Sequence, residues 1–225
     1  MDYDPQGSSL QWLRLRPAHA ENIHGANASS KGCTPLSSIK ALVPENTETL
    51  IIDAPSGVKG LLLQDLVRRS NYILIPVAPS PIDIHATTDF VKNLFLVGGA
   101  RRSTTKVAVV ANRVRSSSAG YESLERFLTE LKLPFLSKIS DSDNYIRAVE
   151  KGLGVFEMDE VSTLAERQEF LPIFRWLDGH APVSHEISQK IELPEKVVSI
   201  EKSGKIVSLN SKRKKLTSSL FSATV

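Results

Sequence analysis

Residues 49–83 constrain the fold more than any other stretch, because two short apolar runs there flank a segment with helical spacing. The runs are residues 50–52 and 72–75, rich in Ile and Leu and bounded by Pro or Gly. Continuous runs of this kind are typical of strands that are covered on both faces of a parallel sheet. We therefore predict two buried strands joined by a helix over residues 61–69, which is a βαβ unit.

A carboxylate follows the first of these runs directly. Asp53 would lie at the carboxyl edge of a parallel sheet, where open α/β folds place their ligands. A carboxylate at this position can orient the water shell of a Mg²⁺ ion bound to nucleotide phosphates. It can equally cap the turn that Pro55 and Gly57 indicate. This stretch alone leaves both interpretations open.

The composition indicates one globular domain. With 225 residues, of which 41% are hydrophobic and 24% charged, the chain can form one α/β domain of roughly 180 residues and a tail. Asp2 and Asp4 do not fit a signal peptide, and no run approaches the roughly 18 apolar residues of a membrane span. Since Cys33 is the one cysteine, a disulfide framework is excluded and a reducing cytoplasm is expected.

The positive charge lies in the last part of the chain. Residues 1–178 hold 20 Lys and Arg against 21 Asp and Glu, whereas residues 179–225 hold 8 against 4. We divide the chain there into a larger domain (1–178) and a basic tail (179–225). In the tail, residues 197–209 could form a small hairpin and a Lys212-Arg213-Lys214-Lys215 cluster follows. The alternative is a disordered, solvated tail.

The rest of the first 178 residues alternates between strand and helix patterns. This alternation predicts an α/β fold with a mostly parallel sheet flanked by helices. The further predicted elements at the start are an amphipathic piece at 10–15 and a helix at 36–42. Next come a helix at 84–97, whose buried side would hold Ile84, Phe90, Val91, Leu94 and Phe95, and a strand at 106–111 ending at Asn112. A helix at 121–131 follows, with an apolar stripe at Leu124, Phe127, Leu128 and Leu131, and then a short strand at 135–136 and a helix at 145–151. The last element is a helix at 163–177 with Phe170, Phe174 and Leu177 as core residues.

Five motifs in order resemble the ParA/MinD family of deviant-Walker ATPases, and ParA-type partition proteins most of all. DYDPQGS at residues 2–8 looks like the Walker A′ segment, and LIIDAPSG around Asp53 looks like Walker B. The other three are IPVAPSPIDIHATTDF, VAVVANRVR and SDSDNYIRAVEKGLGVFEM. Each motif is weak alone, but five in sequence order are specific. The resemblance covers residues 1–177 and implies the SIMIBI-type P-loop NTPase fold, with residues 1–178 as a ParA-like nucleotide-binding domain.

The resemblance assigns roles to individual residues. It implies ATP and Mg²⁺ as cofactors, with Asp4 helping to position the attacking water and Asp53 holding the water shell of Mg²⁺. Asp2 would support the metal side of the site, and Asn112 would contact adenine. Two carboxylates at neighbouring strand ends suit phosphoryl transfer, which needs charge neutralisation and an oriented water. For Asn112, a turn-forming role at a strand end is the alternative.

The sequence departs from the family in one respect. It contains no G-x-x-x-x-G-K-[ST] segment, whose backbone N–H groups and lysine hold the phosphates. We therefore expect an N-terminally incomplete fold, little ATPase activity from this chain alone, and about 40 further residues in the working protein. We also expect marginal stability. In the family, the strand before this segment lies inside the sheet, so a chain without it would leave neighbouring strands uncovered. Burial of about five aliphatic side chains, worth roughly 1.5 to 3 kcal/mol each, would be lost.

The function implied by the resemblance is DNA or plasmid partition, or the positioning of intracellular cargo. ATP would hold two copies together as a homodimer, the dimer would bind nonspecific DNA on the nucleoid, and a ParB-like or cargo-adaptor protein would trigger release. Arg147 and the cluster Lys212, Arg213, Lys214 and Lys215 are the candidates for DNA contact. A solvated helix face and a flexible tail are the alternatives for these residues.

Three other functions compete with this one. The first is a catalytically inactive binding module that pairs with a full-length relative or an adaptor. The second is a MinD-like membrane cycle, against which the thin apolar face of residues 212–225 argues. The third is a metabolic amidoligase or a nitrogenase-type reductase. A single cysteine argues against the iron–sulfur version, because a cluster bridging two chains usually needs at least two from each.

Overall fold

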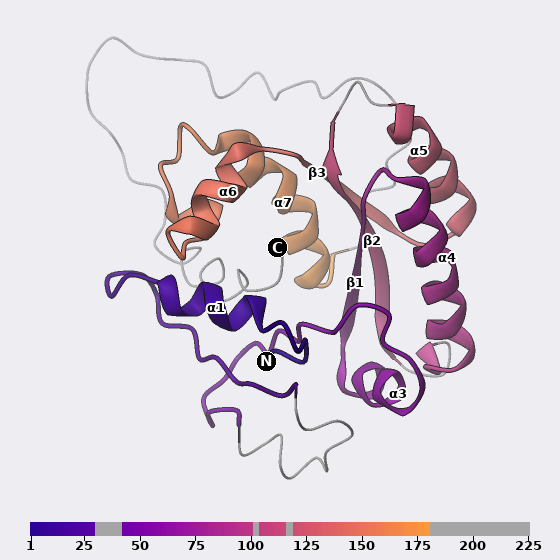
Figure 1. The fold of residues 1–225 in the computed structure, drawn as a ribbon, viewed down its shortest axis with the longest axis horizontal. Helices are drawn as coiled ribbons and strands as arrows, with labels where there is room; N and C mark the ends of the chain where they lie inside the picture. Colours follow the sequence, from indigo (N-terminus) through magenta and orange to yellow (C-terminus); the bar gives the residue numbers. More distant parts are fainter. Residues whose placement is uncertain (30–41, 101–103, 116–118, 181–225) are drawn as a thin grey trace.

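The computed structural model describes residues 1–29, 42–100, 104–115 and 119–180. A three-stranded parallel sheet in the order β1-β2-β3 lies at its centre (Figure 1). Helices and strands alternate along the chain, so the predicted α/β class with a parallel sheet is confirmed. The elements are α1 (Ser8–Leu15), α3 (Gly60–Arg69), β1 (Tyr72–Val77), α4 (Pro81–Leu96), β2 (Lys106–Val114), α5 (Ala119–Leu131), β3 (Phe135–Ser140), α6 (Asp143–Glu150), the 3₁₀ helix η2 (Val155–Glu157) and α7 (Leu164–Leu177).

The central strand β2 pairs differently with its two neighbours. Its pairing with β1 is regular from Tyr72 opposite Lys106 to Val77 opposite Ala111. Its pairing with β3 has irregularities on either side of Val110 and Ala111, and Arg113 adopts a positive φ of 54°. The branched apolar residues of β2 favour the strand, and the irregularity bends its carboxyl end.

One face of the sheet carries the larger core. Alternate residues of β2, beginning with Val107 and Val109, face this side and join a cluster that α3, α4 and α5 cover. Leu94 of α4 and Leu124 of α5 have no exposed surface. Figure 1 shows α4 and α5 together on this side of the sheet. The predicted apolar stripes of both helices are confirmed, since every residue assigned to them joins this cluster.

The opposite face of the sheet packs against α7. Ala108 and Val110 of β2 point to this side and contact a second cluster with Ile173 and Trp176. The Trp176 ring meets the ring of Tyr72 edge-on, with centroids 4.9 Å apart. The buried apolar residues of α7 are thus Ile173 and Trp176, whereas the predicted Phe170, Phe174 and Leu177 are half-buried.

The prediction of a buried strand over residues 50–52 is wrong. These residues are extended, but only Asp53 forms a bridge, and Leu50 is 44% exposed. A run of aliphatic residues specifies an extended, apolar segment, and whether it becomes a strand depends on neighbours with which to pair. The prediction of strand 72–75 and of the helix at 61–69 is confirmed, with β1 ending two residues later and α3 beginning one residue earlier.

Other predicted boundaries shift slightly. Strand β2 runs on through Asn112 to Val114, β3 extends to Ser140, and α6 begins at Asp143 instead of residue 145. The predicted helix at 36–42 falls almost wholly outside the described residues, and so does nearly all of the 179–225 tail with its hairpin. Within the part of the chain that the structure describes, no helix combines the length and apolar character needed to cross a membrane.

Candidate functional site

The candidate site is built on three extended segments near the start of the chain. Residues 1–3 lie between residues 26–28 and residues 51–53 and run parallel to both. On one side the Asp2 amide donates to Ala26 O at 2.8 Å, and on the other the Tyr3 amide donates to Asp53 O at 2.9 Å. The Asp53 amide in turn donates to Met1 O at 2.9 Å. These bonds bring together carboxylates that are 51 positions apart in the sequence.

Asp2 is the buried member of this group. Its side chain is 1% exposed, and its two oxygens accept hydrogen bonds from backbone amides at the start of α1 and just before it. Oδ1 accepts from the Asp4 amide at 3.0 Å, and Oδ2 accepts from the Leu10 amide at 3.3 Å. A carboxylate near the N-terminus of a helix satisfies amides that have no partner within the helix and interacts favourably with the helix dipole. Asp2 therefore fixes the beginning of α1.

Asp53 lies at the end of the neighbouring segment and is half-buried. Its Oδ2 accepts a hydrogen bond of 2.5 Å from the hydroxyl of Ser9, in the first turn of α1. The sequence analysis did not identify Ser9. The Ser8-Ser9 pair before an apolar helix was a signal that one hydroxyl would lie near the site, but only the helix position decides which one.

Asp4 lies in the turn between Asp2 and α1. It is half-buried, and its Oδ1 accepts from the Gln6 amide at 2.9 Å. Gly7, with a positive φ of 66°, then turns the chain into the helix. Asp2, Asp4 and Asp53 thus belong to one locality, which the segment at 51–53 and the first turn of α1 enclose. We call these three residues and Ser9 the carboxylate site.

The other predicted site residues lie apart from the carboxylate site. Asn112 is near the carboxyl end of β2, where its Oδ1 accepts from the amide of Arg113 at 3.1 Å. Arg147 is exposed in the last turn of α6. No hydrogen bond among the described residues joins either of them to the carboxylate site. The cluster Lys212, Arg213, Lys214 and Lys215 lies outside the described residues.

The carboxylate site suits a hydrated ion better than a bare one. Among the described residues, no three His, Cys, Asp or Glu side chains are close enough to enclose a metal ion. Mg²⁺ in nucleotide sites keeps several waters and takes only one or two carboxylates, together with phosphate oxygens. Asp53, half-buried and at the end of its segment, fits that mode. Asp2 does not fit it directly, because both of its oxygens accept backbone hydrogen bonds.

A second polar group fixes α6. Ser142 caps this helix, and its hydroxyl donates to Glu166 Oε1 at 2.5 Å, as the side-chain amide of Asn144 does at 2.9 Å. Burial alone would raise the pKa of Glu166, but these hydrogen bonds outweigh it and hold the pKa below its ordinary value. Glu166 therefore remains a carboxylate and joins the N-terminus of α6 to α7.

No family model matches the sequence. A curated relative is the maintenance of carboxysome distribution protein A of Halothiobacillus neapolitanus, which is 27% identical over 161 residues, or 70% of this chain and 72% of the relative.

Among solved structures, the MinD cell division protein of Aquifex aeolicus aligns with 64% of this chain at 20% identity, with a TM-score of 0.48. The aligned part is 58% of the MinD chain, so this chain spans less than two thirds of that protein's length. With the five motifs in order and this curated relative, the chain resembles the ParA/MinD family of deviant-Walker ATPases.

Proposed function

We propose that this protein is an ATP-dependent positioning protein of the ParA/MinD type, which distributes a cargo within the cell. The curated relative, named for maintaining carboxysome distribution, supports the positioning role. The observation that carries the proposal is the convergence of Asp2, Asp4 and Asp53 at the carboxylate site, from segments at opposite ends of a stretch of fifty residues.

Each carboxylate has a role in the proposal that matches its surroundings. Asp53 would hold the water shell of Mg²⁺, and half-buried Asp4 would orient the attacking water. Asp2, fully engaged with backbone amides, would keep the turn and α1 in place. Bound Mg²⁺ and ATP would supply charge neutralisation and the phosphoryl group, so the task of the chain is positioning. Asn112 would contact adenine from the end of β2.

The proposed cycle includes dimerisation and DNA binding. ATP would join two copies, and the dimer would bind nucleoid DNA through phosphate contacts from Arg147 and residues 212–215. The exposed position of Arg147 supports this assignment. Contacts of this kind weaken steeply as salt rises, because bound protein releases counterions. A ParB-like or cargo-adaptor partner would then stimulate hydrolysis.

The test is Mg²⁺-dependent ATP binding and turnover, with and without DNA. The protein should be compared with a form extended through the upstream reading frame, because the printed sequence lacks a G-x-x-x-x-G-K-[ST] segment. In the active form, Asp4→Ala should lower turnover by at least a hundredfold, whereas Asp83→Ala, which removes an exposed carboxylate of α4, should leave it unchanged. Equal turnover in the two variants would contradict the assignment of Asp4.

The second candidate function is a binding role without catalysis, which the printed residues allow because they contain no G-x-x-x-x-G-K-[ST] segment. A catalytically inactive ParA-like module could pair with a full-length relative and modulate its cycle. This candidate predicts a folded protein that binds no ATP in either form, yet co-elutes with an active relative. ATP turnover by the extended form would exclude it.

A further inference from the structure

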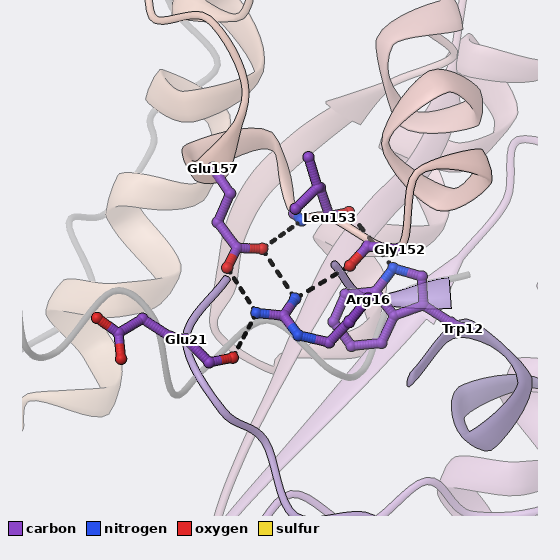
Figure 2. Close-up of polar contacts among 7 residues, drawn as sticks. Trp12, Arg16, Glu21, Gly152, Leu153 and Glu157 are labelled. Atoms are coloured by element: carbon purple, nitrogen blue, oxygen red, sulfur yellow. Dashed lines mark hydrogen bonds and ion pairs between the residues drawn. The ribbon is translucent and has the colours of Figure 1, made fainter. Parts of the chain in front are cut away.

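The end of α1 opposite the carboxylate site is held by an arginine. The Arg16 guanidinium donates from Nη1 to Gly152 O at 3.1 Å and from Nη2 to Glu21 O at 2.7 Å. It also forms a two-pronged ion pair with Glu157, at 2.9 Å from Nη1 to Oε2 and 2.6 Å from Nη2 to Oε1 (Figure 2). The side chain of Arg16 is only 8% exposed. An arginine in this geometry is fixed in position as well as in charge.

Glu157 is equally constrained. Its Oε2 accepts from the Gly154 amide at 2.8 Å, so the carboxylate closes the start of η2 while it binds Arg16. Burial would raise the pKa of Glu157, but the hydrogen bond from Arg16 and that from Gly154 lower it below its ordinary value. The pair joins residues 141 positions apart, which local folding of α1 does not explain.

Trp12 and Gly152 close the same contact. The Trp12 indole is 7% exposed, donates to Leu153 O at 3.4 Å, and lies under the Arg16 guanidinium, whose carbon is 5.0 Å from the ring centroid. Gly152 has a φ of +62°, and a Cβ on it would lie 2.4 Å from Arg16 N and from Leu15 C. The backbone of the loop therefore approaches the end of α1 as closely as a glycine allows. We call Trp12, Arg16, Gly152 and Glu157 the α1 anchor.

The α1 anchor and the carboxylate site hold opposite ends of one short helix. Helix α1 has eight residues, about 12 Å of rise, and helices of this length are marginal by themselves in water. Its position is therefore set by its contacts. At its first turn these are Leu10 N to Asp2 and Ser9 Oγ to Asp53, and at its last turn they are those of Arg16. A shift at one end moves the other.

We propose that Arg16 and Glu157 are positioning residues of the carboxylate site, acting through α1 on the contacts of Asp2, Ser9 and Asp53. The proposal rests on the proposed function for its catalytic consequence, but not for its structural one. Loss of the ion pair lets α1 shift, so the turn over residues 4–7 and the Ser9 hydroxyl lose their fixed place beside the carboxylates. The rest of the fold keeps its cores, which lie on the sheet.

The first measurement is amide hydrogen exchange, which needs no ATP turnover. In Glu157→Gln, amides of residues 4–12 should exchange at least tenfold faster, while those of β2 stay within twofold of the unaltered protein. Arg115→Met is the matched control, because it breaks an ion pair with Asp141 whose arginine side chain is 77% exposed. Unchanged exchange in residues 4–12 of folded Glu157→Gln would overturn the proposal, as would equal acceleration throughout the chain.

Two further variants keep the proposal testable if Glu157→Gln does not fold. Arg16→Lys keeps the charge but loses the two-pronged geometry, and it should accelerate exchange of residues 4–12 by an intermediate factor. Arg16→Met removes both the charge and the hydrogen bonds, and it should accelerate exchange of residues 4–12 at least as much as Glu157→Gln. Exchange in Arg16→Lys or Arg16→Met equal to that of the unaltered protein would contradict the proposal.

The second measurement is ATP turnover by the active form. Glu157→Gln should lower kcat roughly tenfold to a hundredfold and leave KM within about threefold, because misplacement of groups around a reacting centre costs rate more than binding. An unchanged kcat together with faster exchange would contradict the catalytic consequence. If no form turns over ATP, the proposed function fails, and the exchange measurement still decides whether the α1 anchor positions the site.

Discussion

The central sheet and the carboxylate site are held together in different ways. Strand β1 pairs with β2 over its full six residues, and the sheet is covered by an apolar cluster on each face. The segments of the carboxylate site make single bridges instead, and α1 is fixed at both ends by polar groups. Tyr3 and Ala28 are the buried residues through which the site segments join the larger core, and Met1 and Ile52 pack against it.

This difference indicates a division of roles. Apolar burial stabilises the sheet in proportion to the buried area and does not depend on the exact orientation of each side chain. Hydrogen bonds and ion pairs are directional, so they hold the site in one geometry. The sheet should therefore determine global stability, and the site region should respond locally to substitution. Four predictions test this comparison, from the largest effect to the smallest.

The largest effect is expected in the core of the sheet. Leu124→Ala removes a side chain with no exposed surface from α5 and should cost roughly 2.7 to 5 kcal/mol of the free energy of unfolding, because it leaves a cavity. Leu96→Ala, on α4 with its side chain 79% exposed, is the control and should change stability by less than about 0.5 kcal/mol. Denaturant unfolding gives both values. Similar costs for the two would mean that α5 does not pack as described.

The second effect separates backbone strain from crowding at the α1 anchor. In Gly152→Ala the new residue must adopt a positive φ, which should lower the free energy of unfolding by about 1 to 2 kcal/mol. Its Cβ also crowds the end of α1, which should lower that free energy by about 1 to 3 kcal/mol more. Gly57→Ala is the matched control, since Gly57 has a φ of +65° and nothing within 4 Å of its added Cβ. Thermal melts should show the larger loss for Gly152→Ala. Equal losses would argue against close contact between residue 152 and α1.

The third prediction concerns acid. Because the pKa of Glu157 is lowered in the folded protein, its ion pair contributes stability that is present above the ordinary value of 4.5 and lost as pH falls through the lowered pKa. From about pH 5 to about pH 3, the free energy of unfolding should therefore fall less steeply in Glu157→Gln than in the unaltered protein. Glu130→Gln, at an exposed position of α5, should keep the original slope. A slope unchanged in Glu157→Gln would contradict the buried ion pair.

The smallest effect is expected at the first turn of α1. Ser9→Ala removes the hydrogen bond to Asp53 and should cost about 1 kcal/mol, a typical net value for one hydrogen bond. Ser8→Ala, at the exposed neighbouring position, should cost less. Chemical unfolding of the two variants side by side measures the difference. A larger loss of stability in Ser8→Ala than in Ser9→Ala would contradict the hydrogen bond between Ser9 and Asp53.

The accuracy of the sequence analysis varied with the kind of pattern. The runs that became β1 and β2 and the stripes of α4 and α5 were identified correctly, because each repeats an apolar pattern over many residues. Residues 50–52 carry the same local pattern as β1, yet they do not form a strand, because pairing is not written in the run itself. Strand and helix ends shifted by one to four residues for the same reason, since caps and neighbours set them.

The candidate site was predicted in part. The motif order identified Asp2, Asp4 and Asp53, and the structure places them in one locality; their chemical roles stay predictions. Ser9 was missed because adjacent serines are equivalent until the helix fixes which one faces Asp53. The α1 anchor was also missed. Arg16 and Glu157 are ordinary charged residues in the sequence, and nothing local relates two positions 141 residues apart.

The sequence by itself determined the α/β class, the elements with long apolar periodicity and the carboxylates that could do chemistry. These follow from local physics, because a period of two or of 3.6 buries one side of a segment wherever it lies. Only the tertiary structure decided that Asp2 would accept a hydrogen bond from the first turn of α1 and that Arg16, just after the helix, would pair with Glu157. Contacts of this kind join distant segments, and their partners are chosen by packing of the whole chain.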